Sequence, residues 1–414
     1  MKKLIGPITQ ALTMDKLSPK GALKDEQLEV IQEAGILMED GKILHVGKWQ
    51  ELRQDFPQAE ILELKGDFVV LPGLVDCHTH ICFGGSRARD FAMRNAGKSY
   101  LEIAEAGGGI WDTVTQTRKL SVEDLAQRTA KNANRHLSQG VTTIEVKSGY
   151  GLSVQEELKM LRAIMEAGKQ TSAELIPTCL AAHMKPRDFE GTPVEYLNWI
   201  AQNLFPLLKS EGLCQRIDAF VEKSAFSPAE ITPYLQKAKE MGFDLTVHAD
   251  QFSVGGSRVA IEQEALSADH LEASGNQEIE LLAHSNTIAV ALPGASLGLG
   301  CGFTPARKIL DQGGSLAIAS DWNPGSAPMG DLLTQASILA TFEKLSTAEV
   351  FSGLTFRAAA ALGLRDRGKL IPGSLADFIA FPASDFREIL YHQGNLKPSL
   401  VWKSGNLVVG ELGS

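Results

Sequence analysis

Short apolar runs alternate with amphipathic stretches between residues 67 and 363, and this alternation is the main pattern of the chain. The apolar runs contain many β-branched residues, which predicts buried strands. The amphipathic stretches, such as 122–139 and 155–171, have the period of helices. Eight strands in alternation with helices predict an α/β fold, a closed (β/α)8 barrel more than an open sheet. The predicted strands are Leu74–Cys77, Thr142–Val146, Glu174–Cys179, Ala219–Val221, Leu245–His248, Ser267–Asp269, Ile288–Ala291 and Leu316–Ala319.

Both ends of the chain lack this alternation and contain short apolar runs separated by turns. Residues 35–47 carry an Asp-Gly pair between two apolar runs, which predicts a β-hairpin. Residues 369–381 predict a turn that leads into a strand, and residues 401–409 predict a second hairpin. Isolated hairpins are marginal in water, so we expect strands from the two ends to pair. The predicted division is a small composite β-sandwich over residues 1–66 plus 364–414 and a barrel over residues 67–363.

Composition and charge narrow the classes of partner. The 414 residues are 44% hydrophobic and 22% charged, as in an ordinary globular protein. The formal net charge of −10 and the lack of a basic cluster argue against nucleic acid as a partner. No apolar stretch is long enough to span a bilayer, and the first residues lack the apolar run of a signal peptide, so no membrane partner is expected. Five scattered cysteines, an odd number, predict reduced thiols in the cytoplasm.

Polar residues suited to catalysis follow the predicted barrel strands. In such barrels the loops after the strands build the active site, so these side chains should converge on one mouth. A lone histidine is more often a core residue whose hydrogen bonds are all made within the protein. Six strand ends that each carry a polar group of this kind are unlikely to arise by chance. The residues are, in strand order, His78 and His80, Lys147 and Tyr150, His183, His248 and Gln251, His270, and finally Asp321, Asn323, Gly325 and Ser326.

Four of these residues predict a metal site. His78 and His80 are separated by one residue at a strand end, and alternate side chains of an extended chain share a face, about 7 Å apart. His248 and Asp321 add a third imidazole and a carboxylate, a donor set of catalytic zinc sites that keep one position open. A metal there lowers the pKa of water toward about 7, and Asp321 can take the water proton. Cys77 should face away from His78, so we expect it to pack in the core.

The chain carries, in order, the motifs PGLVDCHTH, FGGSRARDFAMRNAGKSYLEIAEAGGGI, EVKSGYGL, VHADQFSVGG, SADHLE and SDWNPGSAP. The first alone marks only the amidohydrolase superfamily, but together they cover nearly the whole chain and resemble the imidazolonepropionase family. The resemblance implies one zinc or iron ion, a homodimer and a small-molecule substrate. It implies that water opens the ring of 4-imidazolone-5-propanoate to give N-formimidoyl-L-glutamate, the third step of histidine degradation. Some other amidohydrolases bind two metals through a modified lysine near the place of Lys147, but the EVKSGYG string favours one metal.

The resemblance also implies which residues bind the substrate. Arg87 matches an arginine that binds substrate in the family, and its planar fork suits a carboxylate or the ring carbonyl. Tyr150, which stands between two glycines, and His183 match substrate-binding positions, and we expect His183 to donate to the ring amide oxygen. The turn-rich positions expected to offer donors to the substrate carboxylate are Asn323, Gly325 and Ser326.

Asp321 and His270 are predicted to handle the protons. Asp321 would accept the water proton and pass it to the leaving ring nitrogen, while His270 orients the water or shuttles its proton. Gln251 occupies a place where some relatives have a carboxylate. An amide cannot accept a proton at neutral pH, so Gln251 is expected to orient catalytic and substrate groups by hydrogen bonding only.

Two other classes of protein stay open from the sequence. Another one-metal amidohydrolase, acting on a purine or pyrimidine, would share the three histidines and the aspartate but not the arginine and the NPGS loop. A barrel that has lost catalysis and serves as an assembly scaffold should have lost metal ligands, whereas all four are present here. Metal analysis and a substrate assay separate these classes.

Overall fold

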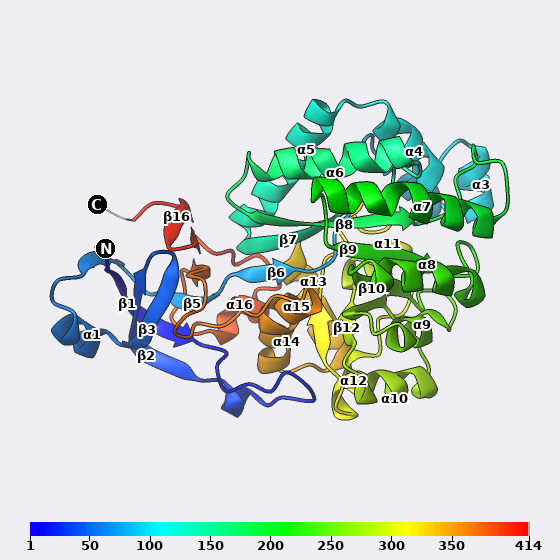
Figure 1. Cartoon of the computed structure of the whole chain (residues 1–414). Coiled ribbons are helices and arrows are strands. Elements are labelled where there is room, and N and C mark those ends of the chain that lie inside the picture. The colour runs from blue at the N-terminus through cyan, green and yellow to red at the C-terminus, as the bar shows by residue number, and fades with distance from the viewer. Residues whose placement is uncertain (413–414) are drawn as a thin grey trace.

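The computed structural model describes residues 1–412, without the side chains of residues 100, 101 and 104 (Figure 1). Residues 413 and 414, at the end of the predicted composite β-domain, lie outside the described residues. The described chain forms two sheets of eight strands each. Figure 1 shows the blue N-terminal strands beside the red C-terminal segment at one end of the molecule, with the cyan-to-yellow middle of the chain at the other.

The middle of the chain forms the predicted (β/α)8 barrel. Each strand pairs in parallel with the next one along the chain, in the order β13 to β6. All eight predicted strands are confirmed, and their ends differ from the prediction by at most three residues. The strands are β6 (Leu74–Asp76), β7 (Val141–Lys147), β8 (Glu174–Ala182), β9 (Arg216–Val221), β10 (Asp244–Ala249), β11 (Ser267–His270), β12 (Ile288–Ala291) and β13 (Leu316–Ile318).

The barrel closes between β6 and β13 through hydrogen bonds just beyond the carboxyl ends of these strands. The Asp321 amide donates to the His78 carbonyl at 3.0 Å, and the His80 amide donates to the Trp322 carbonyl at 2.9 Å. Nearer the barrel centre, the Ser320 amide donates to the Asp76 carboxylate at 3.0 Å. Three of the predicted metal ligands, at positions 78, 80 and 321, therefore lie where the barrel closes, and backbone hydrogen bonds fix their relative positions.

Helices connect the barrel strands and cover the outside of the barrel. Ser121, Ser153 and Thr192 precede three of the longest, and each side chain accepts a hydrogen bond from the backbone amide three residues later. The predicted helices at 122–139 and 155–171 are confirmed as α5 and α6. Among the described residues, no helix has the length and apolar character needed to cross a bilayer. The helices are α2 (Ala88–Asn95), α3 (Tyr100–Glu105), α4 (Ile110–Arg118), α5 (Val122–Ser138), α6 (Val154–Gly168), α7 (Pro193–Glu211), α8 (Pro228–Glu240), α9 (Gly256–Glu262), α10 (Asn276–His284), α11 (Pro293–Leu299), α12 (Ala306–Asp311), α13 (Leu332–Glu343), α14 (Thr347–Leu354) and α15 (Phe356–Ala361).

The two chain ends share one sheet, which confirms the expected composite β-structure. Its order is β16–β15–β14–β5–β1–β2–β3, with β4 paired to β1. β5 joins the two ends because it runs parallel to β1 and antiparallel to β14. The predicted hairpin at 35–47 is β2–β3, whose turn residues Asp40 and Gly41 have φ of 50° and 77°. The elements are β1 (Lys3–Leu12), a 3-10 turn (Asp25–Gln27), β2 (Val30–Glu39), β3 (Lys42–Lys48), α1 (Trp49–Asp55), β4 (Glu60–Glu63), β5 (Val69–Pro72), β14 (Phe378–Phe381), α16 (Arg387–Tyr391), β15 (Leu400–Lys403) and β16 (Asn406–Val409).

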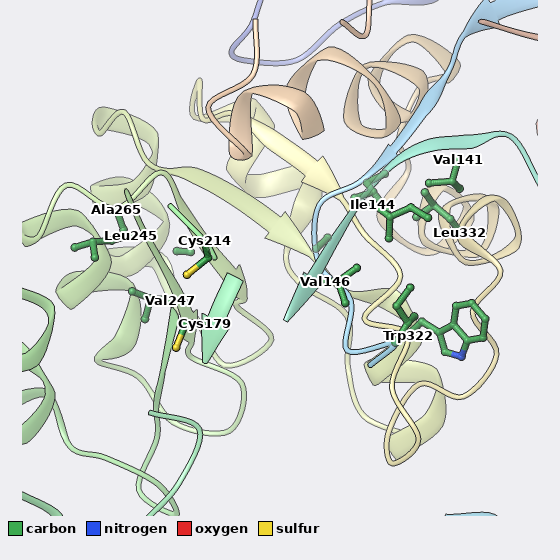
Figure 2. Packing of buried hydrophobic residues seen from close by; sticks show 14 of the residues in the cluster. Val141, Ile144, Val146, Cys179, Cys214, Leu245, Val247, Ala265, Trp322 and Leu332 are labelled. Carbon is green, nitrogen blue, oxygen red and sulfur yellow. The ribbon is translucent and has the colours of Figure 1, made fainter. Parts of the chain in front are cut away.

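Each sheet has its own buried apolar cluster. The largest cluster lies in and around the barrel, and Figure 2 shows Val141 and Val146 of β7 with Leu245 and Val247 of β10 among its members. A separate cluster belongs to the sheet of the chain ends, where the rings of Phe378 and Trp402 stack at 4.6 Å between centroids. Cys77 is buried in a third apolar cluster with Val75 and Ile288, so its expected packing role is confirmed.

Candidate functional site

The four predicted metal ligands meet at the carboxyl end of the barrel. Ligand nitrogens of His78, His80 and His248 all lie within 4.8 Å of one another. The Nε2 atoms of His80 and His248 are 3.3 Å apart, and Asp321 Oδ1 lies 3.5 Å from Nε2 of both His78 and His80. Residues more than 240 positions apart in the sequence are thus gathered around one point.

The protonation of these imidazoles suits metal binding. Burial is the main cause that lowers the pKa of His78 and His80 well below their ordinary values, and it lowers that of His248 to about 3. The three rings are therefore neutral at pH 7 and offer lone pairs. His78 Nε2 is buried and has no hydrogen-bond partner among the described residues. Three neutral imidazoles and one carboxylate around a common point fit a first-row metal ion.

Buried carboxylates orient two of the imidazoles. His78 Nδ1 donates to Asp269 Oδ2 at 2.7 Å, and His248 Nδ1 lies 2.9 Å from Asp218 Oδ2. A proton on Nδ1 leaves Nε2 of each ring free to act as a ligand, which is the usual arrangement of histidines around a metal. Neither acid was predicted as a site residue. An aspartate in the apolar strand IDAF and another directly before His270 were the signals in the sequence.

Lys147 carries a fully buried ammonium group close to Asp218 and Asp269. Its Nζ is 2.8 Å from Glu145 Oε1, 2.8 Å from Asp218 Oδ2 and 4.0 Å from Asp269 Oδ2. Burial alone would lower the pKa of Lys147, but these three carboxylates raise it above its ordinary value. Three buried carboxylates therefore surround this ammonium, and with Asp321 they leave an excess of negative charge that a bound cation would offset.

Asp321 combines an unusual backbone with a perturbed side chain. Its φ is 50°, in the left-handed region, and burial raises the pKa of its carboxyl to about 6. Ser326 Oγ donates weakly to Asp321 Oδ2 at 3.4 Å, and Asn323 Nδ2 donates to the Asp321 carbonyl at 2.7 Å. A carboxyl with a pKa near neutrality can both accept and return a proton, as a general acid–base group must.

A cavity of about 510 Å³ opens above these groups. Its wall includes every residue predicted to converge on the barrel mouth except His78 and Lys147, which are fully buried. The wall also contains residues that were not predicted. Among them are Asp90, Arg94 and Lys98 from the segment around α2, and Phe252 after β10. A cavity of this size suits a small molecule.

His270 and Gln251 lie on the cavity wall, as expected for groups near the water. His270 has a φ of 87°, and its Nδ1 is 3.5 Å from Glu272 Oε2. Burial would lower the pKa of His270, but the Glu272 carboxylate raises it above its ordinary value. Glu222 fixes the loop that carries Gln251, because its carboxylate accepts hydrogen bonds from the Phe252 amide at 2.9 Å and the Ser253 amide at 3.0 Å.

His183 differs from its expected role as a donor. Its Nδ1 lies 3.0 Å from the Gly149 carbonyl, which can only accept, so Nδ1 carries the proton. Burial lowers the pKa of His183 to about 4, so the ring is neutral at pH 7. Its Nε2 is then an acceptor, and the expected bond to the ring amide oxygen is not available. Tyr150 lies beside it, with ring centroids 5.6 Å apart, and burial raises the pKa of its phenol, which stays a donor.

The loop Asn323–Ser326 also differs from expectation. Asn323 Oδ1 accepts from the Gly325 amide at 2.7 Å and from the Ser326 amide at 2.8 Å, while its Nδ2 donates to Ser326 Oγ at 2.9 Å. The backbone donors that were expected to face a substrate carboxylate are therefore occupied within the loop. Arg87 lies beside this loop, because a Cβ atom at Gly325 would be 3.3 Å from Arg87 Nη1, and Arg87 Nε is paired with Asp90 Oδ2.

Comparisons with known proteins agree with this geometry. The profile of the amidohydrolase family matches residues 69–408, which is most of the chain. The protein belongs to the amidohydrolase family and is a hydrolase.

Relatives within that family narrow the assignment. A Bacillus cytotoxicus protein named imidazolonepropionase is 39% identical over 410 residues, covering 98% of this chain and 96% of the relative. A Bacillus mycoides protein of the same name is 39% identical over 406 residues, covering 97% and 95%. Among amidohydrolases, the chain therefore groups with the imidazolonepropionase family.

Solved structures share the fold. A triazine hydrolase variant aligns with a TM-score of 0.75 and 18% identity, covering 99% of this chain and 95% of that chain. The atrazine chlorohydrolase of Arthrobacter aurescens, whose structure is described as complexed with zinc, aligns with a TM-score of 0.73 and 18% identity, covering 98% and 95%. At this identity the likeness concerns the fold alone.

Proposed function

We propose that this protein hydrolyses the ring amide bond of 4-imidazolone-5-propanoate and forms N-formimidoyl-L-glutamate, the third step of histidine degradation. The observation that carries the proposal is the convergence of three neutral imidazoles and Asp321 at the base of a cavity with arginines in its wall. The names of relatives that match nearly the whole chain support the same substrate.

The proposed cofactor is one metal ion, zinc or iron, held by His78, His80, His248 and Asp321. When bound, the ion would act as a Lewis acid that activates water at neutral pH. A single ion is supported by Lys147, whose Nζ is engaged in ion pairs with Glu145 and Asp218 and therefore differs from a lysine modified to bridge two metals. Imidazole and carboxylate donors suit both metals.

Asp321 and His270 would handle the protons of the reaction. Asp321 accepts a proton from the water as the water oxygen adds to the ring carbonyl carbon. The bond from that carbon to the ring nitrogen then breaks, and Asp321 returns the proton to the nitrogen. His270, which Glu272 orients from its Nδ1 side, faces the same cavity and would orient the water. Gln251 contributes hydrogen bonds but no proton transfer.

The remaining cavity residues would position the substrate. Arg87 presents a fixed cation and the Tyr150 hydroxyl a neutral donor. His183, with its proton on Nδ1, would accept from an N–H of the substrate ring. The Asn323–Ser326 loop would shape the wall, because its own hydrogen bonds hold it in one conformation.

We propose the same molecular organisation that the sequence predicts. The barrel over 67–363 would carry catalysis, and the composite β-domain over 1–66 plus 364–414 would support it, in a homodimer as the family resemblance implies. A cytoplasmic location is supported by the five cysteines, none of which forms a disulfide among the described residues.

The test of the proposed function is a comparison of substrates. Purified protein loaded with zinc or iron is incubated separately with imidazolone propionate, guanine and cytosine, and the loss of ring absorbance is followed. We expect turnover of imidazolone propionate alone. Turnover of guanine or cytosine with no activity on imidazolone propionate would show that the protein is instead a nucleobase aminohydrolase.

A further inference from the structure

The loop that carries Tyr150 into the cavity closes around a buried glutamate. Glu157 is the fourth residue of α6, and its side chain is fully buried. Side chains of a helix point back toward its N-terminus, so this carboxylate reaches the loop of residues 148–153 between β7 and α6. Glu157 does not belong to the cavity wall, so any effect it has on the cavity passes through this loop.

Three backbone amides of the loop donate to the Glu157 carboxylate. The Gly149 amide is 3.1 Å from Oε2, and the amides of Gly151 and Leu152 are 2.9 Å and 2.7 Å from Oε1. Burial raises the pKa of Glu157, and hydrogen bonds from the Ser148 side chain and from the three amides oppose that rise. A concave set of amides is complementary to an anion and offsets the cost of burying one. The loop is therefore built around a carboxylate acceptor.

The backbone of the loop is adapted to this carboxylate. Leu152 has a φ of 55°, an unfavourable conformation for a residue with a side chain, and its amide makes the shortest of the three bonds to Glu157. Gly149 has a φ of 101°, which favours glycine. A Cβ atom at Gly151 would lie 2.8 Å from Glu157 Oε1, so the absence of a side chain lets the carboxylate approach. The conformation of the loop thus depends on Glu157 and the glycines together.

Gly149 links Glu157 to the cavity. Its amide donates to the carboxylate, and its carbonyl lies 3.0 Å from Nδ1 of His183. Because a carbonyl can only accept, the position of this group keeps the His183 proton on Nδ1. The next residue, Tyr150, has a neighbour on each side that donates to the carboxylate, and its ring lies 5.6 Å from that of His183 between centroids. Two side chains of the cavity wall therefore depend on the same three amide bonds.

We propose that Glu157 is a positioning residue for the reaction, which holds the Tyr150 hydroxyl in the cavity and, through the Gly149 carbonyl, keeps the proton of His183 on Nδ1. This inference rests on the proposed function, in which Tyr150 donates to the substrate and His183 accepts from it. Glu157 itself does not touch the substrate.

The structural alternative is that Glu157 only stabilises the junction of β7 and α6. A buried carboxylate with three hydrogen bonds contributes to stability in any case. Such a role would lower activity only as far as it lowers the amount of folded protein, and the tautomer of His183 in the folded protein would not change. A second variant of similar stability that leaves the loop intact therefore separates the two roles.

The experiment compares Glu157→Gln and Glu157→Asp with two controls. Glu349→Gln removes another buried carboxylate that accepts from two backbone amides, but Glu349 does not line the cavity. Glu166→Gln changes an exposed glutamate of α6 that pairs with Lys169. All variants are loaded with zinc, urea denaturation measures their stability, and circular dichroism confirms their fold.

NMR of protein labelled with 15N-histidine reports the tautomer of His183, whose signals are assigned by their loss in His183→Asn. The wild type should show the proton on Nδ1. Glu157→Gln should give a mixture of tautomers, because the amide has one acceptor oxygen for three donors and sets its own N–H groups against them. Glu157→Asp, which is one methylene shorter, should show a smaller change in the same direction. Both controls should keep the wild-type signals of His183.

Steady-state kinetics measure the consequence for the reaction. In Glu157→Gln, kcat/KM for imidazolone propionate should fall by roughly 10- to 100-fold, because the groups that position the substrate are displaced. Glu157→Asp should recover part of the loss. Both controls should stay within about threefold of the wild type when rates are referred to folded protein.

The NMR measurement needs no turnover, which keeps this inference separate from the proposed function. If the wild type fails to hydrolyse imidazolone propionate but His183 changes its tautomer in the Glu157 variants, the proposed function is wrong and the link from Glu157 to His183 stands. A wild-type His183 signal in folded Glu157→Gln, or a loss of kcat/KM no larger than that of Glu349→Gln, would overturn the proposal. Where Glu157→Gln does not fold, the same two results in Glu157→Asp would overturn it.

Discussion

The pKa and the hydrogen-bonding role of each polar side chain in the cavity depend more on its neighbours than on its residue type. His183 and His270 face the same space, yet burial lowers the pKa of one to about 4 while Glu272 raises that of the other. His183 is thus a neutral acceptor, and His270 is the ring of the two that binds a proton more readily. Such divergence between like residues in one cavity is how acid and base roles are divided in enzymes.

Replacement of Asp321 by Asn tests the proposed proton acceptor. The amide keeps the shape of the side chain, and the Asn323 bond to the Asp321 carbonyl, 2.7 Å, does not depend on the carboxyl group, so the loop should keep its fold. We expect kcat to fall by roughly 10²- to 10⁴-fold because an amide cannot accept the water proton. Steady-state kinetics give the result, and circular dichroism confirms the fold. Turnover close to that of the wild type would rule out Asp321 as the acceptor.

The sequence indicated the candidate metal ligands more directly than the residues that support them. His78 and His80 stand out by their spacing and Asp321 by its place in the SDWNPGSAP motif. Asp218 and Asp269 were missed because their role depends on which side chains face each other across neighbouring strands. The tautomer of His183 was missed for the same reason, since the Gly149 carbonyl that sets it belongs to a loop after another strand.

Among the elements, the short strands were predictable because each is a compact apolar run, and their order in the barrel follows from the chain. The segment between β6 and β7 was harder to predict. It holds α2, α3 and α4 before the connecting helix α5, and α2 has polar residues on most of its surface. The cations of the cavity wall, Arg87, Arg94 and Lys98, come from this segment, and the sequence predicted only Arg87 among them.

A buried glutamate at α14 provides a prediction about stability and pH. Glu349 accepts from the Ser346 amide at 2.7 Å and the Leu23 amide at 3.0 Å, and it pairs with Arg307 at 2.9 Å. Glu349→Gln should lower the free energy of unfolding by roughly 3 kcal/mol at pH 7, as the loss of a buried ion pair does. Glu195→Gln, in the exposed capping box of α7, is the control and should lower the free energy of unfolding much less. Urea denaturation measures both.

The same pair of variants predicts how the difference depends on pH. Burial would raise the pKa of Glu349, but Arg307 and the two backbone amides hold it below its ordinary value of 4.5. A lowered folded-state pKa contributes stability that is present above the unfolded pKa and lost as pH falls through the folded value. The gap between wild type and Glu349→Gln should therefore be full at pH 7 and shrink below about pH 4.5. A gap that widens on acidification would contradict this assignment.

In the whole molecule, the two chain ends and the catalytic barrel depend on each other. β5 pairs with strands from both ends and leads through Gly73 directly into β6, the strand that delivers His78 and His80. The sequence predicted that strands from the two ends pair, but not which strands do so, because the pairing of β5 with β14 joins residues about 300 positions apart. The composite sheet thus fixes the start of the strand on which the metal site is built.

Metal removal and reconstitution test the central claim most directly. The purified protein is stripped with a chelator, its metal content is measured, and hydrolysis of imidazolone propionate is followed before and after one equivalent of zinc or iron is added. The account predicts one ion per chain, activity that is lost with the ion, and activity that returns when the ion is restored. Full hydrolysis by metal-free protein, or no hydrolysis by protein that carries one ion per chain, would contradict it.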